Sequence, residues 1–349
     1  MGKKMKKQPV QVIKKPTEKD IGFLLCTHEF RVLTLLQVRR FVDLTEYYSR
    51  RKKKLLIDSG YLQANAITGG YQPPPGQLEE RKAYSITGKG VSLLRKHGHD
   101  ITLNADALRI PKAQLPYLLT SYDLAFYLCD HGWQFEQSRY YKARLNLNRQ
   151  GVVKGMLTSP AGVNWVFFVT LSHVNKSTLA KFKQEMESAS GNYFDKAIFT
   201  KDMPALEAIV EFFKEEESLL RFLGSCKVLP QFMVEAYVRY MSTDEEFFSF
   251  LQAIGYPVTK RETTHLFEQW ITEDGFIAVN LLDTDLVKVH EMLSYTDYQL
   301  ERIKGFKVFT TPKLVSVHHQ LLGHLKHVHF QLMEEEIIEE HFTEKRAVH

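Results

Sequence analysis

The chain has 349 residues, an apolar share of 44% and a formal net charge of +5. This length suits two or three compact units, each able to bury its own core. The sequence has no run of about eighteen apolar residues and no apolar stretch behind its basic N-terminus. We therefore expect neither a membrane span nor a secretory signal, and we expect a cytoplasmic location.

The charge is unevenly distributed along the chain. Residues 1–98 contain 20 Lys and Arg against 8 Asp and Glu, a net charge of +12, whereas residues 99–349 carry −7. A phosphate backbone attracts a basic cluster because binding releases its condensed counterions. A basic tail, residues 1–16, explains only part of the excess. Nucleic acid is therefore an expected partner of the N-terminal part rather than of the whole surface.

Three short helices are expected in the first sixty residues, each opening on a threonine that can cap it. They span residues 18–29, 35–41 and 46–58 and follow Thr17, Thr34 and Thr45. Asp20, three residues after Thr17, completes the pattern of a capping box.

A hairpin and a fourth helix are expected next. Strands at 61–64 and 82–86 flank a Pro- and Gly-rich segment, Gly69–Gly76, and a helix at 91–97 follows Thr87. Three helices, a two-stranded wing and a closing helix are typical of the winged helix-turn-helix. We assign it to residues 17–98, with its third helix placed in the major groove of DNA.

Basic and polar residues gather on the expected recognition helix and on the wing. If Leu56 faces the core, helical spacing turns much of this set outward, where it can contact phosphates or guanine edges. The predicted DNA-binding residues are Thr45, Tyr47, Ser49, Arg50, Arg51, Lys54, Arg81 and Lys82. Lys53 stands where similar modules commonly hold an apolar residue. The alternative is a protein-interaction adaptor whose charged helix face is only solvated.

Beyond residue 99, strand and helix patterns alternate and then recur. Val166–Leu171 matches Ile277–Leu282, and Ala197–Thr200 matches Val308–Thr311, at the same offset of 111 residues. This agreement predicts an internal duplication. We expect a first α/β lobe at 99–216, a second at 217–330, and an acidic C-terminal helix or tail at 331–349.

The stretch Ala83–Gly90, followed by the apolar strand Val166–Val169 and a lysine-containing helix, resembles the replication-relaxation family of plasmids and other mobile elements of Gram-positive bacteria. The resemblance covers residues 17 to about 214. It implies a winged helix fused to a lobe of the restriction-endonuclease type, and many members keep an acidic residue just after the central strand. This chain has no acid in Val169–Ser172, and Lys154 with Gly155 stands in place of an aspartate.

The expected fold class is therefore α+β: a winged helix-turn-helix followed by two similar α/β lobes resembling degenerate restriction-endonuclease-like domains. The expected function is sequence-specific binding of double-stranded DNA in the replication, transfer or transcription control of a mobile element. We expect no catalytic residue, no cofactor and no bound metal. A homo-oligomer, or a protein of the same machinery, is left open as a further partner.

A metal-dependent nuclease or nicking accessory is the enzymatic alternative. It would use acids around a strand of the second lobe, because Mg²⁺ needs clustered oxygen ligands. These are Glu273, Asp274, Asp283 and Asp285. Acids flanking a strand are more often caps and turn residues. A relaxase would need a histidine triad in addition to a tyrosine such as Tyr140 or Tyr141, and the sequence has none after that pair.

Two features of the sequence carry no firm assignment. His318, His319, His324, His327 and His329 are expected on a helix, where His324 and His327 form the best pair for a metal, but an ordinary amphipathic helix explains them as well. The acidic segment after them is expected to dock through Leu332, Ile337, Ile338 and Phe342.

The three cysteines, Cys26, Cys129 and Cys226, are expected to be buried small hydrophobes.

Overall fold

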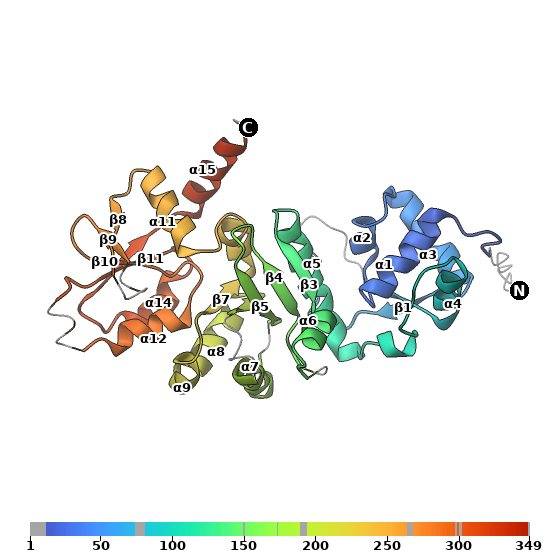
Figure 1. Cartoon of the computed structure of the whole chain (residues 1–349), viewed down its shortest axis with the longest axis horizontal. Coiled ribbons are helices and arrows are strands. Elements are labelled where there is room, and N and C mark those ends of the chain that lie inside the picture. The colour runs from blue at the N-terminus through green and yellow to red at the C-terminus, as the bar shows by residue number, and fades with distance from the viewer. Residues whose placement is uncertain are drawn as a thin grey trace, which may run out of the picture. The chain divides into compact units, whose positions relative to one another are not determined.

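The computed structural model describes residues 12–73, 81–148, 151–172, 174–188, 194–263, 267, 269–296, 299 and 302–347. The chain is a mixed α+β protein whose described residues form three sheets. It divides into two compact units, Met1–Leu124 and Ala125–His349 (Figure 1). No helix among the described residues is long and apolar enough to cross a membrane.

The first unit begins with three helices, α1 (Glu18–Glu29), α2 (Leu35–Arg39) and α3 (Glu46–Asp58). Each follows the threonine that the sequence predicted as its cap. The hydroxyls of Thr17 and Thr34 accept the backbone N–H groups of Asp20 and Gln37, and both pairs form capping boxes. These caps satisfy N–H groups that would otherwise lack partners and so fix where the helices start.

An antiparallel hairpin follows, formed by β1 (Leu62–Ala66) and β2 (Lys82–Ile86). Helix α4 (Gly88–Lys96) comes next and starts three residues earlier than the sequence predicted, because Thr87 caps Gly90 directly. The predicted loop Gly69–Gly76 lies outside the described residues from position 74 onward.

The first unit continues beyond residue 98 through the short helices η1 (Asp106–Leu108) and η2 (Lys112–Gln114) into α5 (Leu115–Cys129). The guanidinium of Arg31 donates to the carbonyl of Leu108 at 3.2 Å, and the Tyr122 hydroxyl donates to the Phe30 carbonyl at 2.8 Å. These bonds join the segment after residue 98 to the end of α1, so the compact unit is longer than the predicted 17–98 module.

The second unit contains a five-stranded sheet with the order β3-β4-β5-β6-β7. The β3–β4 and β4–β5 pairs are antiparallel, and the β5–β6 and β6–β7 pairs are parallel. The strands are β3 (Gln134–Gln137), β4 (Gly155–Thr158), β5 (Asn164–Val169), β6 (Asp195–Thr200) and β7 (Cys226–Pro230). The accompanying helices are α6 (Ser138–Arg144), α7 (Lys176–Ser188), α8 (Met203–Lys214) and α9 (Glu217–Leu220).

A second five-stranded sheet repeats this arrangement. Its order is β8-β9-β10-β11-β12, again with two antiparallel pairs followed by two parallel pairs. Its strands are β8 (Val258–Lys260), β9 (Trp270–Thr272), β10 (Ile277–Asn280), β11 (Phe306–Thr310) and β12 (Val328–Leu332). The helices are α10 (Gln231–Met233), the π-helix η3 (Val234–Val238), α11 (Asp244–Ala253), α12 (Leu286–Ser294), α14 (Val315–Leu322) and α15 (Glu335–Ala347).

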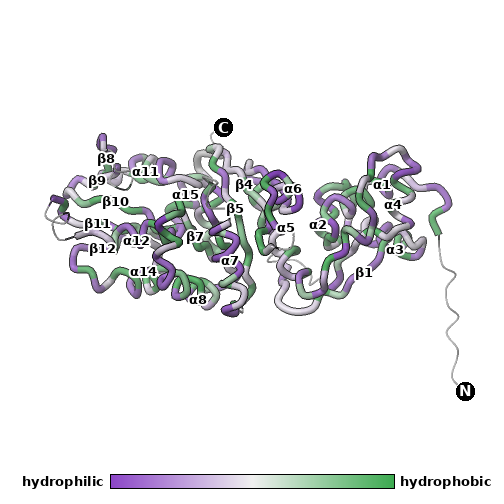
Figure 2. Tube along the Cα trace, turned by 60° about the horizontal axis from the view of Figure 1, so that its bottom comes forward, coloured by the Kyte–Doolittle hydropathy of each residue, from purple (hydrophilic) through white to green (hydrophobic). Residues whose placement is uncertain are grey.

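The central strands β5 and β10 are largely apolar, as their colour in Figure 2 shows, and nearly all of their residues are buried. Trp165 pairs with Asp195 in the first sheet, and Ile277 pairs with Phe306 in the second. The crossover between these parallel strands is thus one residue shorter in the second sheet. A single offset of 111 therefore cannot align both strand pairs.

Two helical segments depart from a regular α-helix. Residues 231–238 form the short α-helix α10 followed by the π-helix η3, in which the hydrogen-bond spacing widens to five residues. The histidine-rich stretch was expected to be helical, and this was wrong beyond Leu322, where α14 ends. His327 precedes β12 and His329 lies within it, because β12 completes the sheet by pairing with β11.

Candidate nucleic-acid interface

Helix α3 presents most of the predicted DNA-binding residues on one exposed surface. Thr45 caps the helix and accepts the backbone N–H of Tyr48. Tyr47 is 71% exposed, and Arg50, Arg51 and Lys54 are also exposed. The Arg50 guanidinium reaches the Glu46 carboxylate at 2.5 Å, but both side chains are more than half exposed, so the pair opens at little cost.

Ser49 does not belong to this surface. Its side chain is fully buried, and its hydroxyl donates to the Glu46 carbonyl at 2.8 Å. It lies seven residues before Leu56, which is also fully buried, so both occupy the helix face that packs into the unit. The structure therefore corrects the prediction that Ser49 contacts DNA.

Two lysines of α3 have structural partners. Lys52 bridges to the buried Asp20 carboxylate at 2.8 Å and to the Thr17 hydroxyl at 3.0 Å, which ties α3 to the start of α1. The Lys53 ammonium lies 5.2 Å from the centre of the Tyr84 ring. This cation–π contact explains how a lysine occupies a place where an apolar residue was expected, since its stem packs while its charge faces the ring.

Arg81 and Lys82 are exposed where the hairpin returns from its tip. Lys82 is the first residue of β2 and pairs with Ala66, and the Arg81 carbonyl accepts the backbone N–H of Ile67. Both residues thus belong to the hairpin, an element separate from α3.

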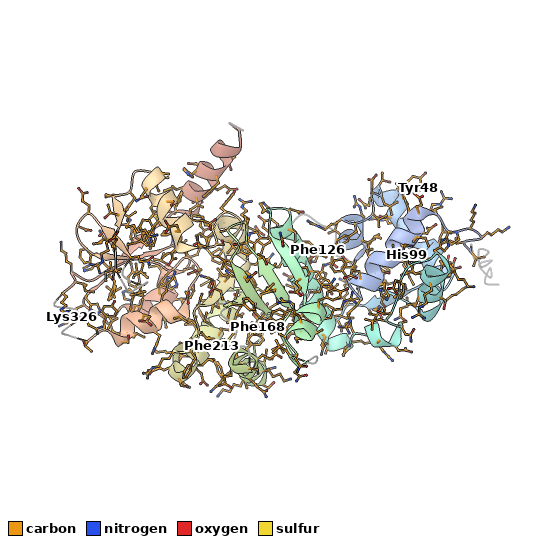
Figure 3. All side chains as sticks on the ribbon, in the orientation of Figure 1. Tyr48, His99, Phe126, Phe168, Phe213 and Lys326 are labelled. Atoms are coloured by element: carbon orange, nitrogen blue, oxygen red, sulfur yellow. The ribbon has the colours of Figure 1, made fainter. Side chains whose placement is uncertain are left out.

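Sequence reasoning missed Tyr48. Its side chain, labelled in Figure 3, is 52% exposed, and its ring meets that of Tyr47 edge to face at 6.0 Å. Tyr48 also lines a hollow of about 650 Å³ beside the start of α3, whose other walls include Lys19, Asp43 and Lys52. Helical spacing from Leu56 places position 48 near the buried face of α3. Tyr48 is exposed nevertheless, because it lies close to the start of the helix.

Three of the four acids proposed for a nuclease have partners within the fold. Asp283 and Asp285 are each 2% exposed, and the Lys227 ammonium lies 2.6 Å from Asp283 and 3.8 Å from Asp285. Asp285 also caps α12 through the Val287 N–H. Asp274, on the surface, pairs with Lys307 at 2.6 Å. Among the described residues no three His, Cys, Asp or Glu side chains are grouped to hold a metal ion.

The terminal histidines and cysteines also serve the fold. His318 is buried, and its ring nitrogens bond the hydroxyls of Thr284 and Thr310 at 3.1 and 2.7 Å. Burial lowers the pKa of His318 to about 4, so the ring is neutral at pH 7. Cys26 and Cys226 are buried as expected, whereas Cys129 is only partly so.

The C-terminal helix docks through half of the residues named for it. Ile338 is fully buried, and the Phe342 ring stacks on Tyr240 at 4.7 Å. Leu332 and Ile337 are instead exposed, at 46% and 41%.

Comparisons of the chain with protein-family models, with curated proteins and with solved structures found no match.

Proposed function

We propose that the first unit binds double-stranded DNA, with α3 in the major groove and the β1–β2 hairpin on the neighbouring backbone. The observation that carries this proposal is the exposed face of α3, where Arg50, Arg51 and Lys54 stand beside Tyr47 with one nearby acid, Glu46. Guanidinium groups can pair with phosphates or with the acceptor edge of guanine. The net charge of +12 in residues 1–98 adds long-range attraction.

Three helices, a hairpin and a closing helix occur in the order typical of a winged helix-turn-helix. Together with the motif resemblance to the replication-relaxation family, this order supports a role in the replication, transfer or transcription control of a mobile element. The second unit then acts in assembly or in contact with that machinery rather than in cleavage, because Asp283 and Asp285 are already engaged by lysine.

The test is the salt dependence of duplex binding by the full chain. The double variant Arg50→Ala/Arg51→Ala should bind duplex DNA about tenfold or more weakly. Its log–log salt slope should fall by roughly one for each phosphate that the variant no longer neutralises. Lys181→Ala, on the exposed face of α7, is the control and should leave both quantities unchanged.

A further pair of variants separates positioning from base reading. Arg51→Lys keeps the charge but loses the two-pronged donor, so it should preserve affinity for random duplex more than affinity for a selected site. If wild type and the double arginine variant bind DNA equally, α3 is not the interface. If wild type binds no duplex at physiological salt, the first unit is a protein-interaction adaptor.

A further inference from the structure

Strand β12 is an open edge of the second sheet. It stands last in the order β8-β9-β10-β11-β12, and among the described residues no strand lies on its outer side (Figure 2). Open edges recruit further strands, and proteins commonly blunt them with short strands, charged residues or proline. The opposite edge, β8, is blunted because it has three residues and ends on Lys260. Strand β12 has five residues, Val-His-Phe-Gln-Leu, without an acid, a lysine, an arginine or a proline.

The backbone groups that point away from β11 belong to Val328, Phe330 and Leu332. The Phe306 N–H donates to the His327 carbonyl, so the odd-numbered residues of this stretch face β11. The even-numbered residues therefore direct their N–H and C=O groups outward, where a further strand can bond to them.

The equivalent edge of the first sheet is covered from within the chain. The first two outward N–H groups of β7 belong to Cys226 and Val228. The Asp285 carboxylate accepts the first at 2.9 Å, and the Asp283 carbonyl accepts the second at 3.1 Å. The segment after β10 thus closes the outer side of β7, whereas no described segment pairs with the outer side of β12.

A second copy of β12, turned antiparallel about a twofold axis at Phe330, matches the backbone of this edge. The axis places Phe330 opposite itself and Leu332 opposite Val328 of the other copy. Each Phe330 N–H can then donate to the other Phe330 carbonyl, and each Leu332 N–H to a Val328 carbonyl. The Val328 N–H keeps its bond to the Leu325 carbonyl at 3.2 Å, so the pairing requires no printed bond of the edge to break.

The side chains of β12 are complementary about the same axis. Leu332 is 46% exposed, and the pairing places the apolar Val328 of the other copy against it. On the opposite face of the strand, His329 meets Gln331 of the other copy, and an imidazole and an amide can share a hydrogen bond. The pairing therefore sets apolar against apolar and polar against polar groups.

The charges at the two ends of the strand are also complementary. Lys326 and Glu334 are both exposed and lie equally far from Phe330 in the chain, on opposite sides of it. The twofold axis therefore brings Lys326 of one copy toward Glu334 of the other, and does so twice. An antiparallel pair of identical strands gains attraction at both ends, which a parallel pair would replace by repulsion.

We propose that β12 is a self-association edge, at which two copies of the chain pair antiparallel and join their second sheets into one continuous sheet. The occupant is a second copy because the strand and its flanking charges are complementary to themselves. One strand pair is a small interface, so the dimer should dissociate on dilution to about micromolar concentration. The edge is far from α3 in the chain, and the proposal does not depend on DNA binding.

Sedimentation equilibrium of the full chain, at about 1–100 µM, measures the dimer. The double variant His329→Lys/Gln331→Lys places ammonium groups opposite each other at two points of the pairing and should raise the dissociation constant about tenfold or more. The matched double variant His329→Glu/Gln331→Lys changes the same positions but sets opposite charges against each other. It should dimerise at least as tightly as wild type. Thermal unfolding of both variants verifies that they fold.

Variants outside the strand test the end charges separately. Lys326→Glu places two carboxylates together at each end and should weaken the dimer several-fold, and adding Glu334→Lys should restore it. These positions flank β12, so the test stands even where a change within the strand impairs folding. Thr259→Lys, an exposed change on the opposite edge β8, is the control and should leave the dimer unchanged.

Four outcomes would overturn the proposal. A wild-type chain that stays monomeric at about 100 µM leaves the edge to a different partner. Equal dimerisation of wild type and both double variants places the interface elsewhere. Equal loss of the dimer in both folded double variants makes the register wrong. Oligomers larger than a dimer indicate a head-to-tail contact in place of the twofold pairing.

Discussion

The two sheets of the second unit share strand order and strand sense but differ in what meets their last strand. Every residue of β7 is buried, whereas β12 is only partly covered. The segment after β10 accounts for this difference at the edge of β7. The Val228 N–H donates to the Asp283 carbonyl at 3.1 Å, and Asp285 accepts the Cys226 N–H at 2.9 Å.

The corresponding segment after β5 carries Thr170, Leu171 and Ser172 and has no acid. Strand β7 completes the first sheet, although residues 217–330 were expected to form the second lobe. The acids after β10 thus hold the second sheet against β7 through Lys227, and residues 170–172 after β5 carry no equivalent acids. The two sheets share a topology, but only the loop after β10 carries acids that bond to β7. The acids of the loop after β10 pair with Lys227 of β7.

The largest predicted effect comes from removing the lysine of this contact. Lys227→Met leaves Asp283 and Asp285 buried, with Lys288 at 3.9 Å as the remaining ammonium near Asp283. We expect a loss of about 3–5 kcal/mol in the free energy of unfolding, because one partner of a buried ion pair is left without compensation. Denaturant unfolding of the full chain at pH 7 measures it.

The control is a pair of the same length on the surface. The Lys260 ammonium lies 2.6 Å from the Glu245 carboxylate, and both side chains are about half exposed. Lys260→Met should cost less than about 1 kcal/mol. Similar losses for the two lysine variants would show that the lobe contact does not depend on the buried charge.

Local signals in the sequence were sufficient for the helix caps and the central strands. Thr17, Thr34 and Thr45 set the helix starts through hydrogen bonds to residues only three positions away. Strand β7 was missed because Lys227 and Pro230 make Cys226–Pro230 look like a loop. The carboxylate that compensates Lys227 lies 56 residues further on, and no local pattern encodes that distance.

On α3 too, the spacing within the helix was predictable from the sequence, whereas burial and contacts with other elements were not. Helical spacing placed Arg50, Arg51 and Lys54 on the exposed side because the helix is regular. It could not tell that Ser49 faces inward with Leu56, or that Lys52 is held by Asp20 from another helix. The restriction-endonuclease-like interpretation of the lobes stays a prediction.

The next largest effect is a pH dependence of the free energy of unfolding that comes from His318 in the second sheet's part of the chain. His318 on α14 has no histidine counterpart on α8 of the first lobe. Its pKa in the folded chain is about 4, below the ordinary value of 6.5, so the folded state favours the neutral ring. The stabilisation is complete above pH 6.5 and is lost as the pH falls toward 4, by up to about 3 kcal/mol.

Comparing unfolding free energies of wild type and His318→Gln between pH 7 and pH 4 isolates this contribution from the carboxylates that titrate in the same range. The variant should lose less stability than wild type over the interval. His319→Gln, at the exposed neighbouring position, should follow the wild-type curve. Parallel curves for wild type and His318→Gln would contradict the buried neutral histidine.

The smallest effect concerns two lysines at the second position of matching strands. Lys196 in β6 is 1% exposed and donates to the Phe194 carbonyl at 2.9 Å, whereas Lys307 in β11 reaches the Asp274 carboxylate near the surface. Burial lowers the pKa of Lys196 to about 8, so at pH 7 the folded chain holds an ammonium that its surroundings disfavour. That cost shrinks as the pH rises from 8 toward 10.5.

Lys196→Met should therefore stabilise the chain at pH 7 by about 1–2 kcal/mol, because relief of the buried charge exceeds the loss of one hydrogen bond. Lys307→Met should destabilise it by less than about 1 kcal/mol. Thermal unfolding of both variants at pH 7 and pH 9.5 measures the contrast, and the advantage of Lys196→Met should diminish at the higher pH. A Lys196→Met chain that is less stable than wild type at both pH values would mean that its ammonium is satisfied inside the first sheet, as that of Lys307 is in the second.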